Sequence, residues 1–146
     1  MGKEKLIRYL FLQVIVVLLI AGCGDEEEKF SSEQYIKMGL DRYVEKDYQG
    51  AIRFYDKAVE VNPNNPIAFH QRGLAKGLLN DLGGALSDLD RAIELDPNYA
   101  QAFFNRGLIR IKVRNAIEGC KDLETAGRLG YEKAYTEMKK YCQKVR

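Results

Sequence analysis

The fold is decided by residues 66–99, which read PIAFHQRGLAKGLLNDLGGALSDLDRAIELDPNY. Residues 100–131 follow as AQAFFNRGLIRIKVRNAIEGCKDLETAGRLGY and align with the first stretch at an offset of 34. Residues 32–65 align at the same offset, so the period holds across three successive units. A fixed period of this length predicts an array of similar units, in a chain of 146 residues that is the size of one ordinary domain.

Small residues and prolines carry the repeat. Three sets are in register: Gly39, Gly73 and Gly107; Ala51, Ala85 and Gly119; and Ala58, Ala92 and Ala126, with Pro63 aligned to Pro97. This pattern resembles the tetratricopeptide repeat, a helix-turn-helix unit of about 34 residues. The resemblance implies an all-α fold, an α-solenoid with repeats at residues 32–65, 66–99 and 100–131.

The repeated residue types have physical roles in such a fold. A glycine midway along each first helix lets the second helix approach closely, although glycine lowers helix propensity. The turn between the helices holds Asp47, Asp81 or Asn115, which we expect to cap the following helix by accepting its free backbone N–H groups. Large apolar residues are expected to fill the core: Tyr35, Phe69, Phe103, Tyr55, Leu89 and Leu123.

Charged residues also recur at the period. Arg72 with Asp88, and Arg106 with Asp122, stand where the first repeat has Met38 and Phe54. Because both members of the pair switch type together, we expect them to touch across the helix pair; anion binding by the two arginines is the alternative. A stripe of Arg42, Lys76 and Arg110 is expected to be solvated or paired within each repeat, with attraction of an acidic ligand as the alternative.

Residues 132–146 are expected to form a C-terminal capping helix. The segment that starts at Tyr131 is two residues out of register with the repeats. One face of the expected helix is apolar and would cover the last repeat, with Ala134, Tyr135, Met138, Tyr141 and Cys142. Cys142 would then lie against Cys120 in the third repeat, and we expect a disulfide between them, with two buried free thiols as the alternative.

Residues 1–22 have the layout of a signal peptide. Lys3, Lys5 and Arg8 precede an apolar run of about a dozen residues, shorter than the about 20 that a membrane-spanning helix needs. Ile20-Ala21-Gly22-Cys23 resembles the lipobox of bacterial lipoproteins. This resemblance implies that Cys23 becomes the first mature residue and carries diacylglycerol and an N-acyl chain such as palmitate. A membrane span and an ordinary secretory signal are the alternatives.

Residues 23–31 are expected to tether the domain to a membrane of the bacterial envelope. Their acidic run at 25–28 is expected to be a solvated linker. The alternative is its resemblance to the surface-export signal of some Bacteroidetes lipoproteins, which would imply the outer membrane or the cell surface as the location. Removing residues 1–22 leaves 20 basic and 20 acidic residues. The mature chain therefore has no basic excess to attract a nucleic acid.

No combination of residues in the sequence indicates a catalytic or metal site. The patterns G-x-S-x-G, P-loop and H-E-x-x-H are absent, and His70 is the single histidine. A zinc site needs further His or Cys ligands, so we expect His70 to contact a partner or solvent rather than a metal. We expect no enzyme activity, and no cofactor apart from the lipid on Cys23.

The resemblance also implies a binding surface, because the first helices of tetratricopeptide repeats line a concave groove that receives peptides or helices. By repeat position its residues are Ile36, Lys37, Leu40, Tyr43, His70, Gln71, Leu74, Phe104, Asn105, Leu108 and Lys112. Ile36 and Leu40 stand where the family's carboxylate clamp for acidic C-terminal tails has lysine and asparagine. We expect a membrane-anchored module that binds another protein; a fixed subunit of an envelope machine that assembles outer-membrane proteins or pili is the alternative.

Overall fold

The computed structural model describes residues 30–143, and this range holds seven helices and no strand. The helices are α2 (Ser32–Val44), α3 (Tyr48–Val61), α4 (Pro66–Leu78), α5 (Leu82–Leu95), α6 (Ala100–Lys112), α7 (Ala116–Arg128) and α8 (Lys133–Tyr141). Within residues 30–143, none of them has both the length and the apolar character needed to cross a membrane. The predicted signal peptide, the lipidated Cys23 and the acidic run at 25–28 lie outside the described residues.

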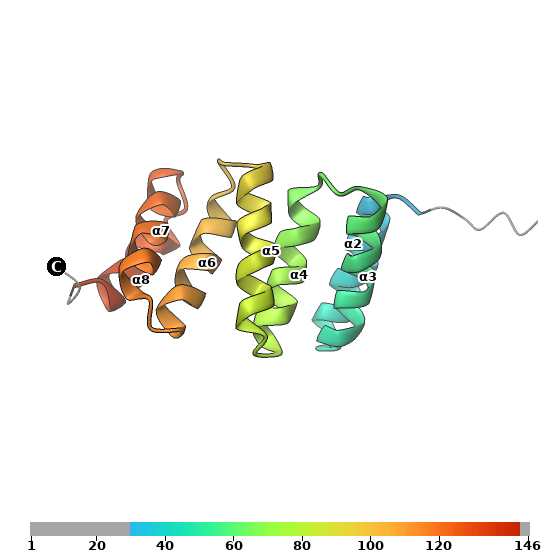
Figure 1. Ribbon diagram of the computed structural model, residues 1–146, viewed down its shortest axis with the longest axis horizontal. Helices are drawn as coiled ribbons and strands as arrows, with labels where there is room; N and C mark the ends of the chain where they lie inside the picture. Colours follow the sequence, from blue (N-terminus) through green and yellow to red (C-terminus); the bar gives the residue numbers. More distant parts are fainter. Residues whose placement is uncertain (1–29, 144–146) are drawn as a thin grey trace, which may run out of the picture.

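The helices form three pairs that stack side by side in a row, followed by α8 at the C-terminal end (Figure 1). Within each pair the two helices pack along their length: α2 with α3, α4 with α5, and α6 with α7. Successive pairs contact each other through α3 with α4 and through α5 with α6. The architecture is therefore an all-α solenoid of three helical pairs plus a C-terminal helix, as the sequence predicts.

Side chains at the helix starts satisfy backbone groups that lack partners. Ser31 caps α2 in a capping box with Gln34. Asp47 accepts a hydrogen bond from the Gly50 N–H at 2.8 Å, and Asp81 accepts one from the Gly84 N–H at 2.9 Å, as predicted for these turns. The prediction for the third turn is wrong, because Asn115 makes no side-chain hydrogen bond at the start of α7.

The glycines midway along the first helices permit close contact within each pair. A Cβ atom built on Gly107 would lie 2.8 Å from the Gly119 carbonyl oxygen, and one on Gly73 would lie 3.2 Å from the Ala85 carbonyl oxygen. In the first repeat the tyrosine ring of α3, rather than backbone, occupies this space beside Gly39. The largest fully buried side chains are Tyr55, Leu89 and Leu123, which occupy one repeat position in the three second helices.

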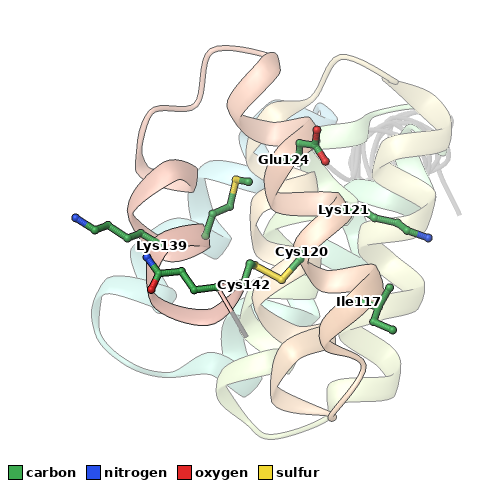
Figure 2. Close-up of a pocket in the computed structure, with 8 residues that line it drawn as sticks. Ile117, Cys120, Lys121, Glu124, Lys139 and Cys142 are labelled. Atoms are coloured by element: carbon green, nitrogen blue, oxygen red, sulfur yellow. A yellow bond between two sulfur atoms is a disulfide. The ribbon is translucent and has the colours of Figure 1, made fainter. Parts of the chain in front are cut away.

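The C-terminal helix α8 packs on α7 and is joined to it covalently. Cys120 in α7 and Cys142 at the end of α8 form a disulfide with a Cα–Cα distance of 5.8 Å (Figure 2). Ala134 is fully buried against the last repeat. Tyr135 and Tyr141, which the sequence places on the covered face, instead remain 55% and 38% exposed, because a helix this short buries only a narrow stripe.

Candidate functional site

The first helices of the pairs share one face of the solenoid. α4 contacts both α2 and α6, in addition to its own partner α5. Eight of the predicted groove residues on this face are at least partly accessible to solvent. Lys37, Leu40 and Lys112 are exposed, and Gln71, Leu74, Phe104, Asn105 and Leu108 are half-buried. These eight side chains are accessible enough to contact a ligand.

Two predicted groove residues are buried between helices, and a third, Tyr43, is half-buried against the first core. Ile36 is 7% exposed and lies in the core formed by the first pair and α4. His70 is 5% exposed. Tyr43 packs edge-on against Tyr48, with ring centroids 5.4 Å apart, and its burial raises its pKa. Repeat position alone did not reveal that Ile36 and His70 are buried, because the side of a first helix that meets the next pair is covered.

His70 joins the second and third repeats through a polar contact that the sequence did not reveal. Its Nε2 lies 2.9 Å from the Asn105 Nδ2, which donates, and its Nδ1 lies 3.1 Å from the Tyr99 hydroxyl. Burial lowers the pKa of His70 to about 4, so the ring is neutral at neutral pH. The expectation that His70 meets a partner or solvent is therefore wrong. Asn105 also donates to the Gln101 carbonyl at 2.8 Å, which leaves its amide oxygen as its free hydrogen-bonding group.

Four of the accessible residues come together at one place, which we call the α4–α6 hollow. It has a volume of about 210 Å³ and lies beside the ends of α4 and α6 and the start of α5. Its lining residues are Leu74, Gly77, Leu78, Leu82, Asn105, Leu108, Ile109 and Lys112. Five large aliphatic side chains with one amide and one ammonium group suit an apolar ligand group with a polar neighbour.

The charged residues of α4 and α6 are mostly paired away from this hollow. Arg72 binds both oxygens of Asp88, at 2.9 and 2.6 Å, and also Asp56 of the preceding repeat, at 2.8 Å. Lys76 contacts the same Asp88 at 2.8 Å. The third repeat has the same set in Arg106, Asp122, Asp90 and Arg110. We call each such set a charged rung.

The rungs place the predicted charge pairs in contact and add partners that sequence reasoning missed. Burial acts to lower the pKa of Arg72, but its hydrogen bonds to Asp88 and Asp56 outweigh this effect and raise the pKa. Asp56 and Asp90 stand 34 residues apart, and this recurrence was the signal that could have found them. Arg42 pairs with Glu45 at 3.1 Å, so all three residues of the basic stripe have a partner within their own repeat.

A larger hollow of about 660 Å³ lies between α7 and α8, beside the disulfide. Figure 2 shows Ile117, Lys121 and Glu124 along one side of it and Lys139 on the other. Its lining comes from α7, α8 and Gln143, so it is separate from the face that the first helices share. Among residues 30–143, no group of three or more His, Cys, Asp or Glu side chains is placed to hold a metal ion.

Family models match two parts of the chain. A model described as TPR repeat matches residues 78–112, and one described as Tetratricopeptide repeat matches residues 45–65. Human and rat serine/threonine-protein phosphatase 5 are 42% identical to this chain over 50 residues. The match covers 34% of this chain but only 9% of each phosphatase.

Solved structures match over most of the described residues. The first TPR of Spaghetti (RPAP3) bound to HSP90 peptide SRMEEVD is 27% identical, with a TM-score of 0.75, and the match covers 78% of this chain and 92% of that one. The second TPR of the same protein, bound to the same peptide, is 26% identical, with a TM-score of 0.66, and the match covers 67% and 91%. The helices of this chain thus have the arrangement of tetratricopeptide repeats.

Proposed function

We propose that this chain, which carries tetratricopeptide repeats, is a protein-interaction module that binds a peptide or helix of another protein on the face shared by α2, α4 and α6. The observation that carries the proposal is the accessible apolar hollow on that face, between α4 and α6. Two solved structures of similar fold, 27% and 26% identical, hold a peptide. A peptide laid along the first helices would meet aliphatic, amide and ammonium groups in turn.

A fixed place in a larger assembly is the second candidate function. It is supported by large apolar side chains of second helices that stand well exposed: Ile117 at 60% and Val61 at 53%. Scattered exposed apolar residues are normal on a monomer, so this observation carries less weight than the hollow. A subunit of an assembly would co-purify with its partners in fixed proportion, whereas an adaptor would purify alone.

We further propose that the module works at a bacterial envelope membrane, held by lipid on Cys23. This proposal rests on the order of the N-terminal residues, namely basic residues, an apolar run and Ile20-Ala21-Gly22-Cys23. The eight residues from Gly24 to Ser31 would span at most about 25 Å when extended, which would keep the groove close to the membrane. Cys23→Ala should move the protein from the membrane fraction to the soluble fraction, and mass spectrometry of the N-terminal peptide should detect the acyl chains. Equal membrane association of the variant would contradict lipid anchoring.

The binding proposal is tested by cross-linking in the cells that make the protein. The full chain is compared with a Leu40→Glu, Leu74→Glu, Leu108→Glu variant, which charges the shared face on three helices. Ile117→Glu is the matched control, because Ile117 is exposed on α7 away from that face. We expect a defined partner to be lost from the triple variant and kept by the control, with equal helical content by circular dichroism. Capture of the same partner by the triple variant would move binding to another surface.

A further inference from the structure

The α4–α6 hollow is lined in part by Gly77, at a repeat position where the other two repeats carry a large side chain. The same repeat position holds Tyr43, Gly77 and Ile111 in the three repeats. Tyr43 packs against the first core and Ile111 packs against the backbone near Gly119, so both occupy the space beside their own helix pair. In the second repeat Gly77 adds no side chain, the Cβ of Ala85 stands where the third repeat has Gly119, and Gly77 lines the hollow.

Close packing does not require the glycine at this position. A Cβ atom on Gly77 would lie 3.6 Å from the Ile109 Cδ1 and 3.8 Å from the Ala85 Cβ, which are ordinary van der Waals contacts. The corresponding distances at Gly73 and Gly107 are shorter and involve backbone oxygen atoms. Glycine in a helix is less stable than alanine, so Gly77 weakens α4 with no gain in packing. Its structural effect is to open the hollow.

The volume and the lining residues of the hollow indicate which kind of ligand group would fit into it. Its volume of about 210 Å³ is below the roughly 300–1,000 Å³ of small-molecule and cofactor sites, so it suits a side chain rather than a cofactor. Leu74, Leu78 and Leu108 lie beside Leu82 and Ile109 in its lining. A branched or long aliphatic side chain would replace water against these five residues.

The charged groups near the hollow indicate which kind of ligand group would lie next to that aliphatic side chain. Neither α4 nor α6 contains an aspartate or a glutamate. The four cations Arg72, Lys76, Arg106 and Arg110 are all neutralised by aspartates of the charged rungs. Lys112 lines the hollow and its Nζ contacts a neutral partner, the Asn80 amide oxygen, at 3.1 Å. Within the described residues 30–143 no carboxylate pairs with this ammonium group, so it can attract the carboxylate of a ligand.

We propose that the α4–α6 hollow binds an aliphatic side chain of a partner peptide and that Lys112 pairs with a carboxylate next to that side chain. The proposal rests on the proposed function and names the chemistry of its ligand. Gly77 makes the hollow deep enough to take the side chain, Leu74 and Leu108 form its walls, and Lys112 sets the polarity of the adjoining residue. The carboxylate comes from an aspartate or glutamate side chain or from a peptide C-terminus.

The test uses selection and then direct binding. A library of short random peptides displayed on phage is selected on the full chain, and the enriched peptides are synthesised with an amidated and with a free C-terminus. We expect enrichment of Leu, Ile, Met or Val beside Asp or Glu. Equal affinity of the amidated form assigns the carboxylate to a side chain; loss of affinity on amidation assigns it to the C-terminus. Failure to enrich any peptide, or enrichment without this pairing, overturns the proposal.

Two variants add side-chain volume beside the hollow, and the smaller one, Gly77→Ala, does so within ordinary van der Waals contacts. Gly77→Ile restores the residue of the third repeat and should weaken binding of the selected peptides by roughly tenfold to a hundredfold, the size of a lost buried aliphatic contact. Gly77→Ala should keep or raise the thermal midpoint and weaken binding less. Gly83→Ala is the matched control, because a Cβ atom on Gly83 would meet nothing within 4 Å, and it should bind as the unmodified chain does. Lys112→Ala should remove the preference for acidic peptides.

The outcomes separate the hollow from the wider groove. If both Gly77 variants bind the selected peptides like the unmodified chain while Leu40→Glu abolishes binding, the shared face is the binding surface and the hollow proposal is wrong. If the Gly77, Leu40 and Leu108 variants all bind normally, the proposed function fails together with it. If Gly77→Ile does not fold, Gly77→Ala against Gly83→Ala decides the question.

Discussion

The first repeat and the two that follow it solve the same packing problem with different chemistry. In the second and third repeats, Arg72 and Arg106 lie between carboxylates of two second helices, one in their own repeat and one in the preceding repeat. The first repeat has Met38 and Phe54 at the positions of Arg72 and Asp88. Within residues 30–143 no helix pair precedes it, so an arginine at position 38 would lack one of its two carboxylates. The comparison shows that the charged rungs bind repeats to each other as well as helices within a repeat.

The same contrast holds at a second position. Ile36, His70 and Phe104 share one place in the three first helices. The His70 ring packs on the Tyr99 ring, with centroids 4.9 Å apart, and the Phe104 ring packs on the Tyr131 ring at 4.8 Å. Ile36 lies instead in the apolar core formed by the first pair and α4. Only the contact between the second and third repeats therefore contains a group that titrates near pH 6.5 when unfolded.

Breaking a charged rung should have the largest effect. Asp88 is 3% exposed and binds both Arg72 and Lys76. Asp88→Ala therefore removes the carboxylate that pairs with these two largely buried cations within their own repeat. We expect a loss of about 3–5 kcal/mol in the free energy of unfolding, measured by urea denaturation.

Copying the first repeat supplies the control for this experiment. The double variant Arg72→Met, Asp88→Phe removes both charges of the most buried pair and should lose less stability than Asp88→Ala, because the charges that it leaves without a rung partner, Lys76 and Asp56, are more exposed than Arg72 and Asp88. A loss below about 1 kcal/mol for Asp88→Ala would show that the rung is not needed, contrary to the comparison of repeats.

Removing the disulfide should have the next largest effect and compares the two ends of the solenoid. The N-terminal end begins with the capping box of α2, whereas the C-terminal end has α8 joined to α7 across a sequence separation of 22. A disulfide that closes a loop of this length stabilises a fold by about 3 kcal/mol, because it lowers the conformational entropy of the unfolded chain. We expect Cys120→Ala, Cys142→Ala to lower the free energy of unfolding by that amount. An unchanged denaturation midpoint would show that packing alone holds α8.

Acid should weaken the contact between the second and third repeats. The pKa of His70 is about 4 in the folded chain and about 6.5 when unfolded, so the unfolded chain binds more protons between these values. Stability therefore rises with pH across this window, and its loss at pH 5 relative to pH 8 is about 2 kcal/mol.

His70→Phe, which copies Phe104, isolates this contribution. Denaturation of both proteins from pH 4 to pH 8 should give curves whose difference changes mainly between pH 4 and pH 6.5. The carboxylates of the rungs are present in both proteins and cancel in the comparison. A constant difference between the two curves would mean that His70 does not set this pH dependence.

The smallest effect concerns the buried tyrosine of the first repeat. Tyr55 is fully buried where the later repeats have Leu89 and Leu123, and within residues 30–143 its hydroxyl oxygen has no hydrogen-bond partner. Burial raises its pKa to about 12. Tyr55→Phe should raise the free energy of unfolding by about 1 kcal/mol, because an unsatisfied buried hydroxyl is removed while the ring is kept. A loss of similar size in thermal or urea denaturation would indicate a hydrogen bond of the hydroxyl in solution.

The sequence by itself determined the repeat and much of what happens within one repeat. The period of 34 placed the three helical pairs, and the joint change from Met38 and Phe54 to Arg72 and Asp88 predicted a contact that the structure contains. Such features are visible in sequence because a helix pair joined by a short turn has one arrangement that buries its small residues. The pairing of Cys120 with Cys142 followed from the same reasoning applied to the last helix.

Contacts between repeats were decided only by the tertiary structure. The second partner of Arg72, the burial of His70 and the open space beside Gly77 all depend on how far one pair is rotated against the next. That rotation is the sum of small differences in side-chain volume along two helices, and no single position in the sequence states it. The sequence therefore indicated which helices share one face, whereas the side chains that are accessible on that face were known only once the pairs were stacked.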